Sequence, residues 1–334
     1  MLSFFDSAQL AHAPRLELHN GAFTASAEVP ERAQGVLRAI GGAQLPPDAG
    51  MTPILAVHSA EYLAFLRDVP GLWQAAGRPG EAIPYAFPIV GRRAVNLARV
   101  DALMGRHSFD ATTPITADTW GAAYANAQTA VAAADAVLGG ERAAFALCRP
   151  PGHHAGEDYC GGYCHLNVAA IAAQRARDAG IGRVAVLDID YHHGNGTQDI
   201  FWTREDVFYA SVHADPATDY PFYWGHADER GAEAGEGTTL NLPLPHGTTL
   251  EPFRRAQAVA LDAIARFGPG LLVVSFGADT WEDDPISHFA LTTADYAVLA
   301  RDIAACGWPT AIVLEGGYGV AALGANVASF LSGF

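Results

Sequence analysis

The chain has 334 residues, 50% of them apolar, which is enough to fill one large hydrophobic core. Its formal net charge of −16 argues against nucleic acid as a partner, because phosphate binding needs basic patches. No apolar run approaches the ~20 residues of a membrane span, the start lacks the features of a secretory signal, and four cysteines are too few for a disulfide scaffold. We therefore expect a cytoplasmic protein that binds neither nucleic acid nor membrane.

Helix-like and strand-like segments alternate along much of the chain. In chain order, helices are predicted at residues 59–66 and 120–138, a strand at 143–147, a helix at 167–179, strands at 184–187 and 207–212, a helix at 250–267, a strand at 271–276, a helix at 293–305 and a strand at 310–314. This alternation is typical of an α/β protein with a parallel sheet and helices on both faces. We predict a single domain, residues 1–334, because no linker or low-complexity tract interrupts the chain.

Two segments break the alternation. Residues 84–114 carry several arginines without clean periodicity, and residues 214–238 are rich in Asp, Glu, Tyr and Gly. Long irregular segments inside compact folds are usually functional loops or interface elements. We therefore expect both segments to serve a binding site or an interface.

Polar clusters follow three of the predicted strands, at the edge where a parallel sheet presents side chains to a crevice. These clusters are His153 and His154 after the first strand, Asp188, Asp190 and His192 after the second, and Asp279 after the fourth. Carboxylates and imidazoles suit a divalent metal, and three protein ligands leave positions open for water and a substrate carbonyl. Spacing alone does not decide whether Asp188 or Asp190 is the ligand. Together the clusters are typical of a metal-dependent hydrolase.

The remaining imidazoles and one tyrosine can supply acid–base chemistry. Adjacent His153 and His154, each oriented by a separate acceptor, can hold different protonation states and divide the base and acid roles. Tyr318 follows two glycines after the last predicted strand, and its hydroxyl can donate to a developing oxyanion. Aromatic residues such as Tyr163 and Tyr220 can line a narrow channel.

These motifs resemble those of the histone deacetylase/acetylpolyamine amidohydrolase family, in the arginase–deacetylase superfamily. The resemblance rests on Arg-Pro-Pro-Gly-His-His from residue 149, Gly-Gly-Tyr-Cys-His-Leu-Asn from residue 161, Leu-Asp-Ile-Asp-Tyr-His-His-Gly-Asn-Gly-Thr-Gln from residue 187 and Glu-Gly-Gly-Tyr from residue 315. It extends over essentially the whole chain and is greatest to the bacterial acetylpolyamine amidohydrolases. It implies the arginase/deacetylase-like α/β fold, with one central sheet and long active-site loops.

The resemblance also implies the metal sites. The zinc ligands would be Asp190, His192 and Asp279, although the same three donors can also hold iron(II). A structural potassium ion would be bound by Asp188, Asp190, His192, Ser211 and Val212.

The catalytic roles follow from the same resemblance. His154 would be the general base and acid, hydrogen-bonded to Asn195. His153 would be its electrostatic partner, hydrogen-bonded to Asp188. Tyr318 would be the hydroxyl that polarises the substrate carbonyl.

The resemblance further implies a small cationic acetylated amine as substrate and a homo-oligomer, dimer or tetramer. The substrate-binding residues would be Tyr163, Tyr220, Gly162, Ile286, Gly316 and Gly317. In polyamine deacetylases the insertion, here residues 84–114, contacts a second subunit and supplies an acidic residue for the distant ammonium. Asp101 is the candidate for that residue, although Arg99 and Arg106 lie close enough in sequence to engage it in ion pairs.

Other functions remain open at this point. A broader deacylase acting on acetyl-lysine in proteins or on other amides would use the same site. An arginase-type ureohydrolase is disfavoured, because its two-metal site needs more clustered Asp and His residues. A binding protein without catalysis is disfavoured by the complete set of ligands, paired histidines and tyrosine.

Overall fold

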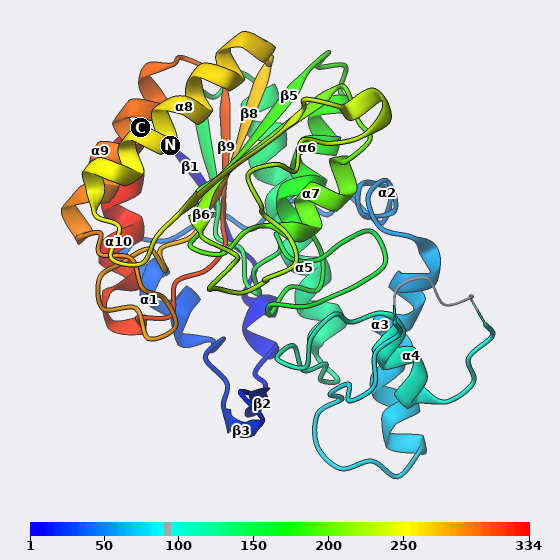
Figure 1. The fold of residues 1–334 in the computed structure, drawn as a ribbon. Helices are drawn as coiled ribbons and strands as arrows, with labels where there is room; N and C mark the ends of the chain where they lie inside the picture. The colour runs from blue at the N-terminus through cyan, green and yellow to red at the C-terminus, as the bar shows by residue number, and fades with distance from the viewer. Residues whose placement is uncertain (90–94) are drawn as a thin grey trace.

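Seven parallel strands form one central sheet in the computed structural model, which describes residues 1–89 and 95–334 (Figure 1). In spatial order the strands are β1 (Leu2–Phe4), β4 (Ala143–Ala146), β9 (Thr310–Leu314), β8 (Leu271–Phe276), β5 (Val184–Asp188), β6 (Val207–Ala214) and β7 (Thr239–Leu244). All neighbouring pairs are parallel. The predicted parallel α/β sheet is therefore confirmed, and all five predicted strands lie in it.

Helices cover both faces of the sheet (Figure 1). One face packs against α1 (Glu31–Ile40), α8 (Leu250–Phe267), α9 (Thr293–Ala305) and α10 (Val320–Leu331). The other packs against α5 (Thr119–Leu138), α6 (Val168–Asp178) and α7 (Asn195–Phe201). The short helix α2 (Thr52–Leu55) contacts α6, and α3 (Ala60–Ala75) lies farther from the sheet, in contact with α5 and α4 (Val100–Arg106). Successive strand residues alternate between the two hydrophobic cores: Val186 belongs to one and Leu187 to the other.

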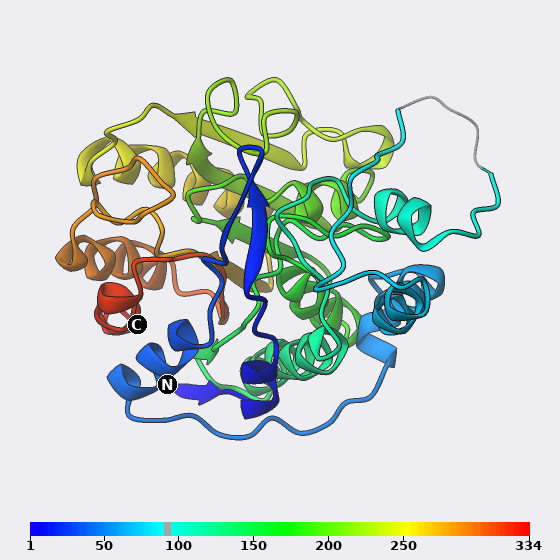
Figure 2. The ribbon, with the colours of Figure 1, turned by 90° about the horizontal axis from the view of Figure 1, so that it is seen from below.

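The strands not predicted are short or lie at the sheet edges. They are β1, β7 and the hairpin of β2 (Leu16–His19) and β3 (Ala22–Ala25). The helices α1, α2, α4, α7 and α10 were not predicted either. Seen from below, the hairpin crosses the centre of the molecule, over the end of the sheet at which the central strands terminate (Figure 2). The unpredicted hairpin therefore contributes to the region where the sequence places the functional residues.

The segment at residues 84–114 departs from the sheet and contains α4. Its base is closed by two backbone hydrogen bonds of 3.0 Å between Ala82 and Ile115. Residues 90–94 of this segment lie outside the described residues. Among the described helices, none combines the length and the apolar composition needed to cross a bilayer.

Candidate active site

The three predicted zinc ligands converge at the carboxyl edge of two adjacent strands. Asp190 and His192 follow β5, Asp279 follows β8, and β5 pairs directly with β8. One ligand atom of each residue lies within 4.8 Å of those of the other two. His192 Nδ1 is 3.2 Å from Asp279 Oδ2 and 3.4 Å from Asp190 Oδ1. The arrangement offers two carboxylates and one imidazole to a single divalent cation.

The surroundings of these side chains fit a bound cation. Asp190 and Asp279 are both fully buried, and burial together with the nearby Asp190 charge raises the pKa of Asp279 to about 7. A cation between the two carboxylates relieves this repulsion. A Cβ on Gly316 would lie 2.3 Å from Asp279 Oδ2, and Gly316 N donates a 2.8 Å hydrogen bond to Asp190 Oδ2. Only glycine leaves room for the ligands at this position.

Asp188 lies beside the predicted cation ligands and bonds to other groups. Its Oδ2 lies 3.0 Å from His153 Nδ1 and accepts a 3.0 Å bond from the Tyr209 hydroxyl, and its Oδ1 accepts from Asp190 N at 3.2 Å. The group of ligand atoms within 4.8 Å of one another comprises Asp190, His192 and Asp279, without Asp188. Of the two aspartates that the spacing left open, this grouping favours Asp190 as the ligand.

The paired histidines have different partners and different pKa shifts. His153 Nδ1 lies 3.0 Å from Asp188 Oδ2, and His154 Nδ1 lies 2.7 Å from Asn195 Oδ1. Burial lowers the pKa of His153, but the carboxylates of Asp188 and Asp190 outweigh burial and raise the pKa to about 10. Burial and the neighbouring His153 charge hold the pKa of His154 well below its usual range. A neutral imidazole beside a charged one is the arrangement that divides base and electrostatic roles.

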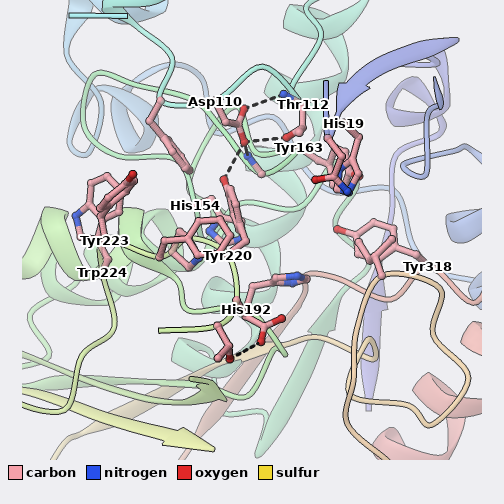
Figure 3. A pocket seen from close by; sticks show the side chains of 18 residues that line it. His19, Asp110, Thr112, His154, Tyr163, His192, Tyr220, Tyr223, Trp224 and Tyr318 are labelled. Carbon is pink, nitrogen blue, oxygen red and sulfur yellow. Dashed lines mark hydrogen bonds between the residues drawn. The ribbon is translucent and has the colours of Figure 1, made fainter. Parts of the chain in front are cut away.

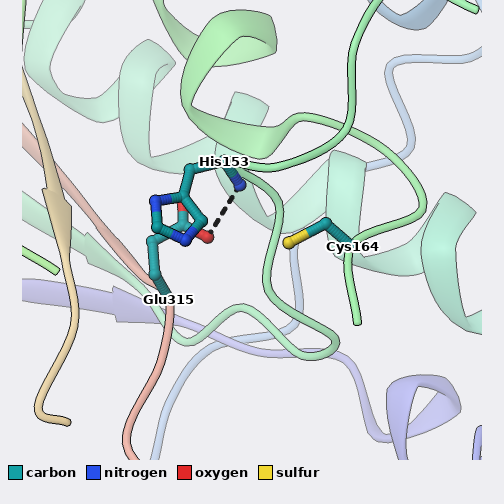
Figure 4. A group of neighbouring side chains, drawn as sticks. All are labelled: His153, Cys164 and Glu315. Atoms are coloured by element: carbon teal, nitrogen blue, oxygen red, sulfur yellow. Dashed lines mark hydrogen bonds between the residues drawn. The ribbon is translucent and has the colours of Figure 1, made fainter. Parts of the chain in front are cut away.

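A buried glutamate, quoted in the sequence motif at residue 315 but given no role there, fixes the loop that carries this pair (Figure 4). Glu315 accepts hydrogen bonds from Gly152 N at 2.5 Å, His153 N at 3.1 Å and the Ser275 hydroxyl at 2.7 Å. Burial raises the pKa of Glu315 to about 7. With His153 and Cys164 it forms a group whose atoms are close enough for a metal. Because its oxygens already accept these bonds, Glu315 serves to hold the loop.

Tyr318 is held by residues far away in the sequence. Tyr318 N donates to Asp284 Oδ2 at 2.7 Å, and the Arg32 guanidinium lies 4.7 Å from the tyrosine ring centroid. Arg32 also donates to Gly317 O at 2.7 Å and pairs with Glu28 at 2.9 Å. Arg32 and Glu28 are each 1% exposed, so this charged pair is enclosed beneath the loop that carries Gly316 and Gly317. Sequence reasoning missed both residues, because the groups that Arg32 contacts lie far from it in the sequence.

If the Tyr318 hydroxyl donates to the developing oxyanion as predicted, Tyr318→Phe should lower kcat by ~10²–10³-fold, because it deletes that hydroxyl and keeps the ring beside the Arg32 guanidinium. Steady-state kinetics at equal metal content would measure the loss. A decrease of less than about fivefold would leave Tyr318 with a packing role only.

A cavity of about 570 Å³ opens above these groups (Figure 3). Its wall includes His154, His192 and Tyr318, together with four residues predicted to bind substrate: Gly162, Tyr163, Tyr220 and Ile286. In Figure 3 Tyr318 lies across the cavity from His154 and Tyr220. The predicted channel residues are therefore brought together, except that Gly316 and Gly317 support the ligands and the tyrosine loop without lining the cavity.

The aromatic wall depends on one carboxylate that sequence reasoning missed. Asp110 Oδ2 accepts from the Tyr220 hydroxyl and from Gly162 N, both at 2.8 Å. Phe109 stacks on Tyr220 with ring centroids 5.7 Å apart. A Cβ on Gly162 would lie 2.2 Å from a ring carbon of His154, and its φ of +54° also favours glycine. Asp110 thus fixes two parts of the wall, and it gave no signal in the sequence because it lies within the irregular segment.

The structure places Asp101 away from the cavity. Its Oδ2 lies 2.6 Å from an Arg78 nitrogen and 2.7 Å from an Arg99 nitrogen, and these two guanidinium groups lower its pKa against the effect of desolvation. Asp101 is not among the residues that line the cavity, whose carboxylates are Asp110 and Asp219. Within one chain, Asp101 is therefore engaged in ion pairs, one of them with Arg99 as its sequence neighbourhood suggested.

The residues proposed for potassium lie on two paired strands. Asp188 and Ser211 are register partners in β5 and β6, and the Ser211 hydroxyl lies 2.7 Å from His213 Nδ1. Val212 follows in β6 and is fully buried. The potassium site stays a prediction.

The loops at one edge of the parallel sheet carry two carboxylates and an imidazole, two buried histidines and a tyrosine hydroxyl. This combination is typical of the class of metal-dependent hydrolases.

Comparisons with known proteins identify the family. The histone deacetylase domain matches residues 26–334. The chain is 46% identical to acetylpolyamine amidohydrolase 1 of Pseudomonas aeruginosa, over 100% of this chain and 99% of the relative. It is also 46% identical to the acetylpolyamine amidohydrolase of Mycoplana ramosa, over 96% and 95%. The crystal structure of acetylpolyamine aminohydrolase from Burkholderia pseudomallei superposes with a TM-score of 0.96 at 46% identity, over 100% and 98%. The chain belongs to the histone deacetylase family and is a hydrolase.

Proposed function

We propose that the protein is a zinc-dependent amidohydrolase that removes the acetyl group from a small cationic amine such as an acetylpolyamine. The observation that carries this proposal is the convergence of Asp190, His192 and Asp279 with the His153–His154 pair and Tyr318 at one aromatic-walled cavity. The names of the full-length relatives support the substrate class.

The metal would be held by Asp190, His192 and Asp279, whose donor set suits zinc and also accepts iron(II). A divalent cation bound there lowers the pKa of a coordinated water and polarises an amide carbonyl. Neutral His154 takes the proton from the attacking water and then gives it to the leaving amine nitrogen. Charged His153 stabilises the negative charge that develops beside it. The Tyr318 hydroxyl donates to the oxygen of the former carbonyl.

Charge favours a cationic substrate. The net charge of −16 attracts cations over a range that salt limits to roughly 8–10 Å. The cavity lining combines the aromatic rings of Tyr163 and Tyr220 with the carboxylate of Asp219. A broader deacylase acting on acetyl-lysine or on other amides remains the second candidate, because the same groups would hydrolyse any acetyl amide that reaches them.

One kinetic panel tests the proposal. We expect kcat/KM to be higher for acetylputrescine, acetylcadaverine or acetylspermidine than for an acetyl-lysine peptide, and a metal chelator to abolish all four activities. A higher kcat/KM for the acetyl-lysine peptide would instead favour the broader deacylase as the function of the protein. Activity unaffected by complete metal removal would contradict the zinc-dependent mechanism.

Asp101→Asn should change kcat/KM to the same extent for acetylputrescine and for an uncharged acetamide of equal length. The reason is that Arg78 and Arg99 already neutralise this carboxylate within the chain. Parallel kinetics on the two substrates would measure the effect. A loss of about tenfold or more confined to acetylputrescine would correspond to a charge-assisted contact of ~1.5–3 kcal/mol and would make Asp101 the partner of the ammonium.

We propose a homo-oligomer, dimer or tetramer, with residues 84–114 as a contact between copies. Because Asp101 lies away from the cavity of its own chain, in such an oligomer it could reach only the cavity of a neighbouring subunit. Exposed apolar side chains within this segment, Tyr85 at 67% and Ile89 at 69% exposure, support the contact. We also propose that a structural potassium ion is bound at Asp188 and Ser211. The proposed location of the protein is the cytoplasm.

A further inference from the structure

A second group of side chains that could hold a metal lies beside the cavity, which its member Asp219 lines, separate from the three predicted zinc ligands. Asp219, His246 and His288 offer one carboxylate oxygen and two imidazole nitrogens, all within 4.8 Å of one another. Both histidines are exposed, whereas the Asp219 side chain is only 12% exposed and also lines the cavity. Ions in solvent therefore reach a group whose carboxylate faces the active site.

Backbone hydrogen bonds join the two loops that carry the histidines. Gly247 N donates to His288 O at 2.7 Å, and Ala290 N donates to Thr248 O at 2.8 Å. The two imidazole rings have centroids 4.5 Å apart. Because these two backbone bonds join the loops next to His246 and His288, the two rings are held together without any bond between them.

The carboxylate is oriented by a residue of the main site. The Tyr191 hydroxyl donates to Asp219 Oδ1 at 2.9 Å, and the other carboxylate oxygen makes a short contact with His246 Nε2. Tyr191 lies between Asp190 and His192 in the sequence, and its backbone N donates to Asp279 Oδ1 at 3.0 Å. Asp219 is therefore preset to present one oxygen to the histidines.

We propose that Asp219, His246 and His288 form a second site for a divalent cation, of the type best suited to Zn²⁺. Two imidazoles and one carboxylate match the ligands that zinc prefers, whereas Mg²⁺ prefers oxygen ligands only. Tetrahedral zinc with bonds near ~2.1 Å separates its ligand atoms by about 3.4 Å, so a small rotation of the exposed imidazoles closes the site. The cation takes the place of the direct contact between Asp219 and His246.

An ion at this rim would inhibit the enzyme, an effect that rests on the proposed function. It would withdraw Asp219 from the cavity lining and place positive charge where a cationic substrate enters. Entry of an uncharged amide would be affected less. Inhibition by excess zinc is therefore expected to raise KM for the cationic substrate and to leave kcat nearly unchanged.

Equilibrium dialysis tests the site directly. Enzyme already holding one zinc per chain is dialysed against increasing Zn²⁺, and bound metal is counted. We expect wild type to approach about two zinc ions per chain and His246→Ala/His288→Ala to stay near one, with Mg²⁺ unable to compete. His19→Ala is the matched control: it removes another exposed histidine that lines the cavity and should keep the second ion.

Wild-type enzyme that binds only one zinc, or a double variant that binds the second as well as wild type, would overturn the site and leave an Asp219–His246 ion pair. Retention of the first zinc by the double variant reports that it folds. Kinetics then test the inhibitory role separately. Equal zinc inhibition of acetylputrescine and of an uncharged acetamide would contradict that role, while the dialysis result would still decide whether the site exists.

Discussion

Asp279→Ala should abolish both metal retention and deacetylation. A site with three protein ligands has no spare donor, and the change also leaves Tyr191 N without the oxygen that accepts its 3.0 Å hydrogen bond. The remaining carboxylate and imidazole cannot hold the cation through purification. Elemental analysis of the purified variant, followed by an activity assay, measures both losses.

Asp283→Ala provides the matched control for this substitution, because it removes an exposed carboxylate from the same segment. The control should keep its metal and its activity. Full metal occupancy in Asp279→Ala, together with a wild-type rate, would show that Asp279 is not a ligand.

His154→Ala should retain the metal and lose ~10²–10⁴-fold in kcat, the usual contribution of a general acid–base group. The pKa of His154, held low by burial and by neighbouring His153, leaves its imidazole neutral and able to accept a proton. Substrate binding should change little. Single-turnover kinetics with metal content measured in parallel separate loss of chemistry from loss of metal.

The companion variant His153→Ala assigns the roles within the pair. It removes the hydrogen-bonded partner of Asp188 and the positive charge beside His154, and we expect a smaller decrease in kcat than for His154→Ala. The opposite order would reverse the two roles.

The strands that could be predicted from sequence are the buried ones. The runs at residues 271–276 and 310–314 match β8 and β9 in both bounds, because both faces of a central parallel strand are apolar. β7 lies at a sheet edge, alternates in burial and contains Pro243, which is tolerated there and conceals the strand pattern. β1 has only three residues, too few for a periodic signal.

The site residues that directly follow strands could be predicted from the sequence. The residues that only support them could not. Asp190 and Asp279 each follow a buried strand. Because the carboxyl ends of parallel strands lie at the same edge of a sheet, their positions in the sequence predict that the two side chains lie close together. Glu315 and Arg32 act through backbone groups that only the folded chain brings near them. Asp110 fixes Tyr220 through a contact 110 residues away in the sequence, which no local pattern reports.

The hydrogen bonds that Arg32 donates to the loop before Tyr318 also join the two ends of the chain. Arg32 donates to Glu315 O across 283 residues, and α1 packs against α10 so closely that a Cβ on Gly324 would lie 2.6 Å from Gly35 O. Such contacts join segments far apart in the sequence, and the entropy of closing a very long loop opposes their formation. Because Glu315 and Tyr318 lie close to the C-terminus, α1 cannot make these contacts until that part of the chain has been synthesised. A chain truncated before Glu315 would therefore lack both Tyr318 and the contacts that hold it.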